Sequence, residues 1–220
     1  MGRSRVLAFA LLLVTACASR RSGPSREFSG FLDDYSLLRR GGPNDVALVY
    51  RDPEAPWTAY DKVLFEPVTL WRSGRHSLDA VPEGDLLRLV TDLEAAVRRR
   101  LGAGFALVEE PGAGVMRIRL AITEARASDP VLDVLRARGG GDVTRGEGPL
   151  DPETHRFLES ARIEGEIRDA RTDRLLAAGV DWRRREGALP IDSWAEVDRA
   201  LDLWAERVCA RLESRTRKAR

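Results

Sequence analysis

Residues 115–123 alternate apolar and polar side chains with a period of two, the pattern of a β-strand with one buried face. The apolar set is Met116, Ile118, Leu120 and Ile122, and the opposite set is Arg117, Arg119 and Thr123. Strict alternation predicts an antiparallel sheet that buries one face and leaves the other in water. Any fold of this chain therefore has to supply a second layer over the apolar face.

A helix with one apolar stripe is predicted directly after Pro82. It carries Glu83 and Asp85 in its first turn and arginines 98–100 in its last, the charge order that a helix dipole favours. We interpret these arginines as a helix end rather than as a lipid-headgroup or nucleic-acid contact. The stripe consists of Leu86, Leu89, Val90, Leu93, Val97 and Leu101. Glycines at positions 102 and 104 are expected to end the helix.

A second amphipathic helix is predicted over about Ser193 to Glu213, with Ser193 as its N-cap. Its stripe is Trp194, Val197, Leu201, Trp204, Val208 and Leu212. Further strands are expected at residues 63–71, 105–108, 161–169 and 174–183, of which the last two form a hairpin. These elements predict an α+β two-layer sandwich, a mostly antiparallel sheet of about five strands with two main helices packed on one face.

The predicted strands carry details that a structure can check. The charged side chains expected on the wet face of the hairpin are Arg162, Glu164, Glu166 and Arg168. Across the turn, the apolar set is Leu176, Ala178, Val180 and Trp182. Pro67 has no amide donor, so its strand should lie at an edge or be bulged there. Residues 130–138 are expected to form one or two helical turns, and residues 139–149 a mobile loop.

The N-terminus has the three parts of a secretory signal peptide: arginines at positions 3 and 5, an apolar run at 6–14, and a close of small residues before Cys17. At about 1.5 Å per residue, the apolar run covers about half of a roughly 30 Å hydrocarbon core. It is therefore too short to span a bilayer. We assign residues 1–16 to a signal peptide.

The last residues of this segment, Val14, Thr15, Ala16 and Cys17, resemble a bacterial lipobox. That resemblance implies that the Cys17 thiol receives diacylglycerol, that the chain is cut before it, and that the new amine is acylated. One acyl chain binds only reversibly, so three should anchor the protein to a membrane. Ala18 stands where inner-membrane lipoproteins carry Asp, which favours the periplasmic face of a Gram-negative outer membrane. The alternative is an ordinary signal peptide with a chance cysteine.

Residues 17–27 combine the acylated cysteine with Ser, Gly, Pro and charge, and are expected to form a flexible tether. Residues 28–60 are predicted to form a strap docked on a single α+β domain at 61–214. Two interpretations of the start of this strap stay open: it packs on its own sheet, or it is an interaction epitope. The candidate epitope residues are Phe28, Phe31, Leu32, Asp34, Tyr35 and Leu38.

Three short motifs lie along the chain. They are Ser-Gly-Phe-Leu-x-Asp-Tyr-Ser-x-Leu at 29–38, Tyr-Asp-Lys-Val at 60–63 and Asp-x-x-Thr at 169–172. With the lipobox, they resemble an uncharacterised bacterial lipoprotein family catalogued as domain of unknown function 3313. The resemblance covers most of the mature chain. It implies a location and a fold, and it brings no activity.

The charge is nearly balanced, with 36 Lys and Arg against 35 Asp and Glu. A phosphate-binding face needs a net basic patch, so no nucleic-acid partner is expected. Of the two cysteines, one is assigned to lipid, which leaves Cys209 without a disulfide partner. Its apolar neighbours on the helical stripe favour a buried, inert thiol over a nucleophile.

The sequence shows no short motif for catalysis, metal binding or a cofactor. His76 and His155 are far apart and lie beside predicted loops. The glycine run at 139–142 lacks the Lys-Ser/Thr ending of a phosphate-binding loop. Neighbouring carboxylates at 33–34 and 109–110 point apart and do not form an acid/base pair. We expect no enzyme activity, no metal and no cofactor beyond the covalent lipid, although a Ser-His-Asp triad of distant residues stays open.

Three functions remain open. The first is a non-enzymatic binding or scaffold module at the outer membrane, with an envelope protein of unknown identity as its partner. The second is a small-ligand or lipid-handling periplasmic domain, which predicts an apolar cavity between helices and sheet. The third is a cell-envelope hydrolase, which would require acidic, serine or histidine side chains to converge in a cleft.

Overall fold

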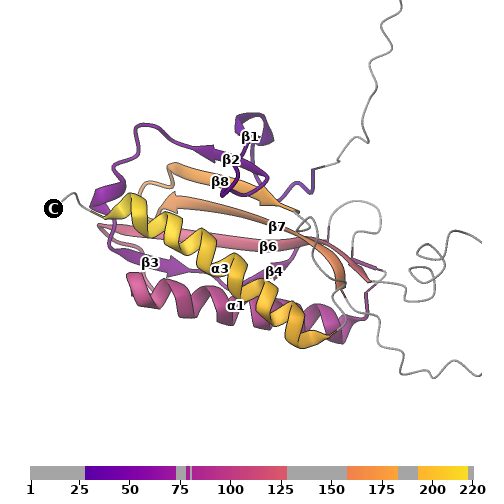
Figure 1. Cartoon of the computed structure of the whole chain (residues 1–220). Helices are drawn as coiled ribbons and strands as arrows, with labels where there is room; N and C mark the ends of the chain where they lie inside the picture. Colours follow the sequence, from indigo (N-terminus) through magenta and orange to yellow (C-terminus); the bar gives the residue numbers. More distant parts are fainter. Residues whose placement is uncertain (1–27, 73–77, 80, 128–157, 183–192, 218–220) are drawn as a thin grey trace, which may run out of the picture.

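The computed structural model describes residues 28–72, 78–79, 81–127, 158–182 and 193–217. Within these ranges an eight-stranded sheet carries two long helices on one face (Figure 1). The strands are β1 (Arg39–Arg40), β2 (Leu48–Arg51), β3 (Lys62–Phe65), β4 (Thr69–Leu70), β5 (Ala106–Leu107), β6 (Val115–Ala127), β7 (Leu158–Asp169) and β8 (Leu175–Asp181). The helices are α1 (Glu83–Gly104) and α3 (Trp194–Thr216), with two short 3₁₀ helices, η1 (Tyr35–Leu37) and η2 (Trp57–Ala59).

The sheet is mixed, with both parallel and antiparallel pairs. Its order is β1-β2-β8-β7-β6-β3-β5, and β4 also pairs with β6. β3 runs parallel to β5 and β6, and β4 runs parallel to β6, whereas the remaining pairs are antiparallel. The α+β class is confirmed, but the prediction of about five mostly antiparallel strands was wrong. α1 provides the long crossover that parallel strands need, and several added strands have only two residues, too few to show a period.

Two predicted strands are interrupted. Residues 63–71 form β3 and β4 with a break around Pro67, which has no amide to donate to a neighbouring strand. β8 has an irregular register opposite the end of β7, so Leu176 joins the helix-side core while Ala178 and Val180 face the other side. The predicted alignment of Leu176 with these residues was wrong, because a bulge shifts the alternation by one position.

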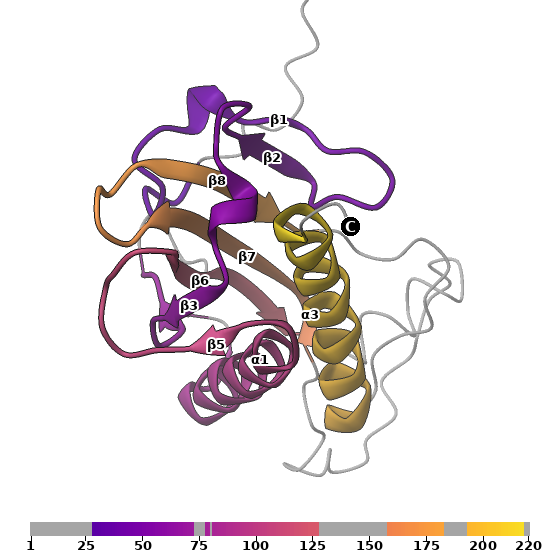
Figure 2. The same cartoon turned by 90° about the vertical axis from the view of Figure 1, so that its left-hand side faces the viewer.

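α1 and α3 lie side by side across one sheet face and bury the main core beneath them (Figures 1 and 2). Both predicted stripes face this core, and Leu93 at the centre of α1 is fully buried. α3 adds two smaller buried residues, Ala205 and Cys209. The helical layer is therefore the part of the fold that side-chain periodicity predicts best.

The arginine triplet of α1 joins the two helices. α1 continues to Gly104, so arginines 98–100 lie before the last turn, and their predicted place at the helix end was wrong. Two of them form ion pairs with α3, Arg99 with Asp202 and Arg100 with Glu206. A pattern of charges within one helix does not reveal acids that a second helix brings alongside.

The opposite sheet face is covered as well. Residues 28–38 cross it and build a second apolar cluster with it, formed by Phe31, Leu32, Leu38, Ala121, Ala178 and Val180. Thr123, Glu164 and Glu166, which the alternation placed in water, are 2%, 0% and 3% exposed. The prediction of a wet face was therefore wrong. Alternation identifies the apolar face, but a polar face can also be covered when its charges are paired.

Both apolar clusters and the whole sheet lie within residues 28–217. The predicted signal peptide, the lipobox and the tether up to residue 27 lie outside the described residues. The same holds for the helical turns expected at 130–138 and the loop expected at 139–149. Among the helices that the structure describes, none is long and apolar enough to cross a membrane.

Candidate functional site

The predicted strap divides into two parts. Its later residues form β1, β2 and η2, whereas residues 28–38, which we call the arm, cross the sheet face opposite the helices. Within the arm, Gly30 has a φ of +79°, a conformation that side-chain-bearing residues rarely adopt. Asp34 caps η1 by accepting a hydrogen bond from the Ser36 amide at 2.8 Å, and the hydrogen bonds from Ser36 lower the pKa of Asp34.

Aromatic contacts hold the middle of the arm. The buried ring of Phe31 packs edge-on against Trp71, with 5.5 Å between ring centroids. The guanidinium of Arg119 lies 5.1 Å from the centroid of the same ring. The indole N–H of Trp71 donates to the carbonyl of Ser29 at 3.1 Å. Trp71 therefore binds the arm through both its ring and its polar atom.

Tyr35 joins the arm to a buried carboxylate. Its hydroxyl donates to Oε2 of Glu164 at 2.5 Å, and the amide of Leu32 donates to the same hydroxyl at 3.2 Å. The other carboxylate oxygen of Glu164 accepts from the hydroxyl of Thr123 at 3.0 Å. Burial and the neighbouring Glu164 raise the pKa of Tyr35 above its ordinary value, so the phenol keeps its proton and remains a donor.

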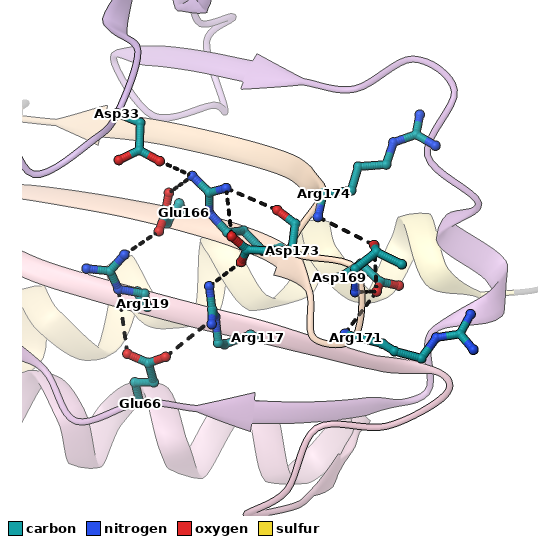
Figure 3. A network of polar contacts seen from close by, with 11 residues as sticks. Asp33, Glu66, Arg117, Arg119, Glu166, Asp169, Arg171, Asp173 and Arg174 are labelled. Atoms are coloured by element: carbon teal, nitrogen blue, oxygen red, sulfur yellow. Dashed lines mark hydrogen bonds and ion pairs between the residues drawn. The ribbon is translucent and has the colours of Figure 1, made fainter.

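Beside this contact, six charged side chains form a closed ring on the sheet (Figure 3). This charged ring consists of Glu66, Arg117, Arg119, Glu166, Arg168 and Asp173. Acidic and basic members alternate, with N–O distances of 2.5 to 3.7 Å. They come from the end of β3, from β6, from β7 and from the β7–β8 turn, so the ring ties four segments together.

Asp33 attaches the arm to the charged ring. Its carboxylate lies 2.6 Å from a guanidinium nitrogen of Arg168, which also contacts Glu166 at 3.0 Å. Hydrogen bonding to Glu166 raises the pKa of Arg168 against the opposing effect of burial. Every carboxylate of the ring faces a guanidinium, so none is placed to take a proton from a substrate. The arrangement is suited to holding the arm by charge-assisted hydrogen bonds.

The Asp-x-x-Thr motif builds the turn next to the ring. Asp169 accepts hydrogen bonds from the amides of Arg171 and Thr172 at 3.0 and 2.7 Å, and from the Thr172 hydroxyl at 2.9 Å. The hydroxyl of Tyr60 donates to its second oxygen at 2.8 Å. Burial favours the neutral acid, but these hydrogen bonds prevail and hold the pKa of Asp169 below its usual value. Burial and Asp169 raise the pKa of Tyr60 to about 12, so two of the sequence motifs meet in one contact.

The candidate epitope residues divide between buried and exposed positions. Those packed into the second cluster are Phe31, Leu32 and Leu38. Tyr35 is half-buried, and Phe28 stacks on it with 4.2 Å between centroids while remaining 50% exposed. Asp34 is exposed. An epitope for a second protein stays a prediction, with Phe28 and Asp34 as its accessible members.

The sequence prediction of the site omitted Glu164, Glu166 and Arg168. They were assigned to solvent because charged side chains are rarely buried unless they are paired. The sequence did contain a signal, because every second residue from 162 to 168 is charged, and both acidic and basic residues occur among them. A neighbouring strand with two arginines at matching spacing predicts cross-strand ion pairs.

A separate apolar cavity of about 170 Å³ lies between α3 and the helix-side face of β2, β8 and β7. Trp57, Trp204 and Val208 are among its lining residues. Cys209 also lines it, and burial raises the pKa of this thiol to about 12. The thiol therefore stays neutral near pH 7, which agrees with the predicted inert cysteine. A cavity in this position is what the ligand-binding hypothesis requires.

The remaining candidate groups that the structure describes lie in separate contacts. In the part of the chain that the structure describes, no three His, Cys, Asp or Glu residues are grouped to hold a metal ion. Asp33 pairs with Arg168 while Asp34 caps η1, so these neighbouring carboxylates serve different contacts. Glu109 and Glu110 are exposed after β5, and both histidines lie outside the described residues.

The fold and the site define a two-layer α+β domain whose second sheet face is closed by an N-terminal arm. The sequence profile of a family described as protein of unknown function (DUF3313) matches residues 27–208. The chain belongs to this family. The matched region begins just before the arm and contains the charged ring and most of α3.

Comparisons with other proteins add distant similarities. No curated protein matches the chain. A dodecamer of a PelC variant from Paraburkholderia phytofirmans has a TM-score of 0.39 at 10% identity, covering 77% of this chain and 96% of that one. A putative neuraminyllactose-binding hemagglutinin homolog from Helicobacter pylori has a TM-score of 0.33 at 12% sequence identity, and the match covers 82% of this chain and 92% of that one. Protein XCC0632 from Xanthomonas campestris, of the DUF330 family, has a TM-score of 0.30 at 10% sequence identity, and the match covers 74% of this chain and 86% of that one. At these TM-scores and identities, the similarities carry no information about function.

Proposed function

We propose that this protein is a lipoprotein of the Gram-negative envelope, held at the periplasmic face of the outer membrane by acyl chains on Cys17. Its domain acts as a non-enzymatic binding or scaffold module. The lipobox and the tether support the anchor. One observation supports the module: the arm, which follows the tether directly, is bound across the sheet beside a ring of paired charges.

The arm limits how the domain can move relative to the anchor. The arm is held to the domain from Phe28 and Ser29 onward, so the proposed connection to the anchor is the predicted tether before it. Residues 18–27 reach roughly 35 Å when fully extended. The exposed members of the arm, Phe28 and Asp34, then lie close to the membrane, where a neighbouring envelope protein can contact them.

The anchor is tested by changing Cys17→Ala in the native host. Palmitate labelling should be lost, and the protein should leave the outer-membrane fraction, because the thiol that accepts diacylglycerol is gone. The matched control is Cys209→Ala, which removes the other cysteine and should keep both labelling and location. Labelling of Cys17→Ala at the wild-type level would rule out the lipoprotein assignment.

The partner is tested by placing a photoreactive phenylalanine at position 28 and, in a second strain, at position 87. Both side chains are about equally exposed, at 50% and 55%, but Leu87 lies on α1. Irradiation in the native host should link position 28, and not position 87, to one envelope protein that mass spectrometry identifies. Equal products at both positions would show that the arm is not the binding surface.

A further inference from the structure

The cavity beneath α3 exists because its floor is made of small residues. Gly165, Ala177 and Gly179 occupy neighbouring positions on the helix side of β7 and β8. A methyl group added to Gly165 would meet Leu120 at 2.4 Å, and one added to Gly179 would meet Val46 at 2.8 Å. The side chains of Leu120 and Val46 therefore pack directly against the two glycines, and both also line the cavity, which we call the slot.

Four arginines and two aspartates line the mouth of this slot. They are Arg51, Arg207, Arg211, Arg215, Asp45 and Asp181. Asp45 pairs with Arg51 and with Arg211, the latter at 2.9 Å. Asp181 accepts from the Trp204 indole at 3.1 Å and lies 3.3 Å from Arg207. Glu166 also lines the slot, but its carboxylate pairs with Arg119 and Arg168. The four arginines therefore face two remaining carboxylates, which leaves an excess of positive charge.

Arg215 carries that excess. It makes no hydrogen bond or ion pair with another residue in the described ranges, and it is half-buried. Burial, with Arg51 and Arg211 nearby, lowers its pKa against the opposing effect of Asp45. A guanidinium placed among like charges is stabilised by an incoming anion.

The size of the slot limits what can enter. A dry cavity of about 150 Å³ in another protein accommodates benzene, whereas drug-sized ligands occupy pockets of about 300 Å³ or more. A cavity of about 170 Å³ therefore takes one slim apolar group. The volume leaves room for one acyl chain and not for two. Because its pKa is raised to about 12, the Cys209 thiol adds no charge to the apolar part of the slot near pH 7.

We propose that this slot binds a medium-chain fatty carboxylate, with the alkyl chain between α3 and the sheet and the carboxylate beside Arg215 and Arg211. The alkyl chain gains free energy when its apolar surface leaves water. The carboxylate gains charge-assisted hydrogen bonds from Arg215, which has no ion pair within the described residues, and from Arg211, which shares Asp45 with Arg51. This site is separate from the arm and does not depend on the lipid anchor.

The test compares octanoate, octanol and octylammonium by calorimetry on the chain from residue 18, which retains every described element. The three ligands share one alkyl chain and differ in charge. Octanoate should bind at least roughly tenfold more tightly than octanol, and octylammonium more weakly still. Cys209, the only cysteine left in this chain, should react more slowly with a small thiol reagent when octanoate is bound.

Matched variants locate the ligand. Arg215→Gln should weaken octanoate roughly tenfold and leave octanol unchanged, whereas Arg199→Gln, an exposed arginine elsewhere on α3, should change neither. Ala177→Leu should remove binding of both by filling the floor, with thermal melting to check that it folds. Equal affinity for octanoate and octanol, or unchanged Cys209 reactivity, would overturn the proposal. Phosphatidylglycerol vesicles are titrated as a further ligand. If the protein binds these vesicles and not octanoate, the proposal is also overturned, because such binding would indicate a membrane contact.

Discussion

The hydroxyl of Tyr35 lies 2.5 Å from a carboxylate oxygen of Glu164, a residue 129 positions later in the chain. Glu164 has no exposed surface, so this oxygen depends on the protein for its donor. Tyr35→Phe should lower the free energy of unfolding by about 1–3 kcal/mol, the usual cost of an unsatisfied buried acceptor. Urea denaturation of the chain from residue 18 measures the change. Tyr50→Phe is the control, because the Tyr50 hydroxyl has no hydrogen bond within the described residues, and an equal loss in both variants would contradict the assigned contact.

Arg168 connects the arm with the charged ring through Asp33 and Glu166. Arg168→Gln should destabilise the domain by about 2–3 kcal/mol, because Glu166 is buried and keeps only Arg119 as a charged partner. Hydrogen exchange at the arm amides should also accelerate, since Asp33 loses its contact.

The control for this variant is Arg171→Gln, an exposed arginine in the adjacent turn. It removes the same charge and should leave both the stability and the exchange rates of the arm nearly unchanged. If Arg168→Gln lowers stability while arm exchange stays at the wild-type rate, the contact between Asp33 and Arg168 does not hold the arm.

Alkaline unfolding should report the contact between Tyr60 and Asp169. The pKa of Tyr60 rises from about 10 to about 12 on folding, so its contribution is fully present below about pH 10. The contribution is lost as the pH rises toward 12, because the unfolded state releases its proton first. The loss should be on the order of 2 kcal/mol. Tyr60→Phe should flatten the pH dependence of the unfolding free energy between pH 10 and 12, although Tyr35 and Cys209 shift in the same direction and leave a residual slope.

Leu93 and Leu87 test the assignment of the α1 stripe. Leu93 is fully buried in the core between the helices and the sheet, whereas Leu87 is 55% exposed on the same helix. Leu93→Ala should cost about 2–5 kcal/mol of stability through lost burial and a residual cavity. Leu87→Ala should change it by less than about 0.5 kcal/mol. Similar melting temperatures for the two variants would show that the stripe faces another direction.

Periodicity in the sequence predicted both long helices, the central strand and the hairpin at 169–174, because each of these elements is long enough to repeat its pattern. β1 and β2 escaped prediction, and for the split of β3 from β4 only the irregularity at Pro67 was predicted. Strands of two to four residues have no period, and their existence depends on neighbours far along the chain.

The charged ring shows the same limit for the site. The spacing of Arg117 and Arg119 indicated a face of β6, but no feature of that strand indicates that Glu166 and Glu66 lie opposite. Their register is set by strand pairing, which local sequence does not specify. The apolar cavity is even harder to predict from the sequence, because it depends on where α3 crosses three small residues of the sheet.

Strand β2 pairs residues 48–51 with residues 177–180 of β8, and the arm binds side chains of β7. Synthesis proceeds from the amino end, so the arm is made long before the surface that receives it. Closing so long a loop is entropically costly and slow. Until β8 has been synthesised, Phe31, Leu32 and Leu38 lack the surface of Ala178 and Val180 on which they pack. The partly folded chain therefore exposes these apolar side chains, which favours aggregation at that stage.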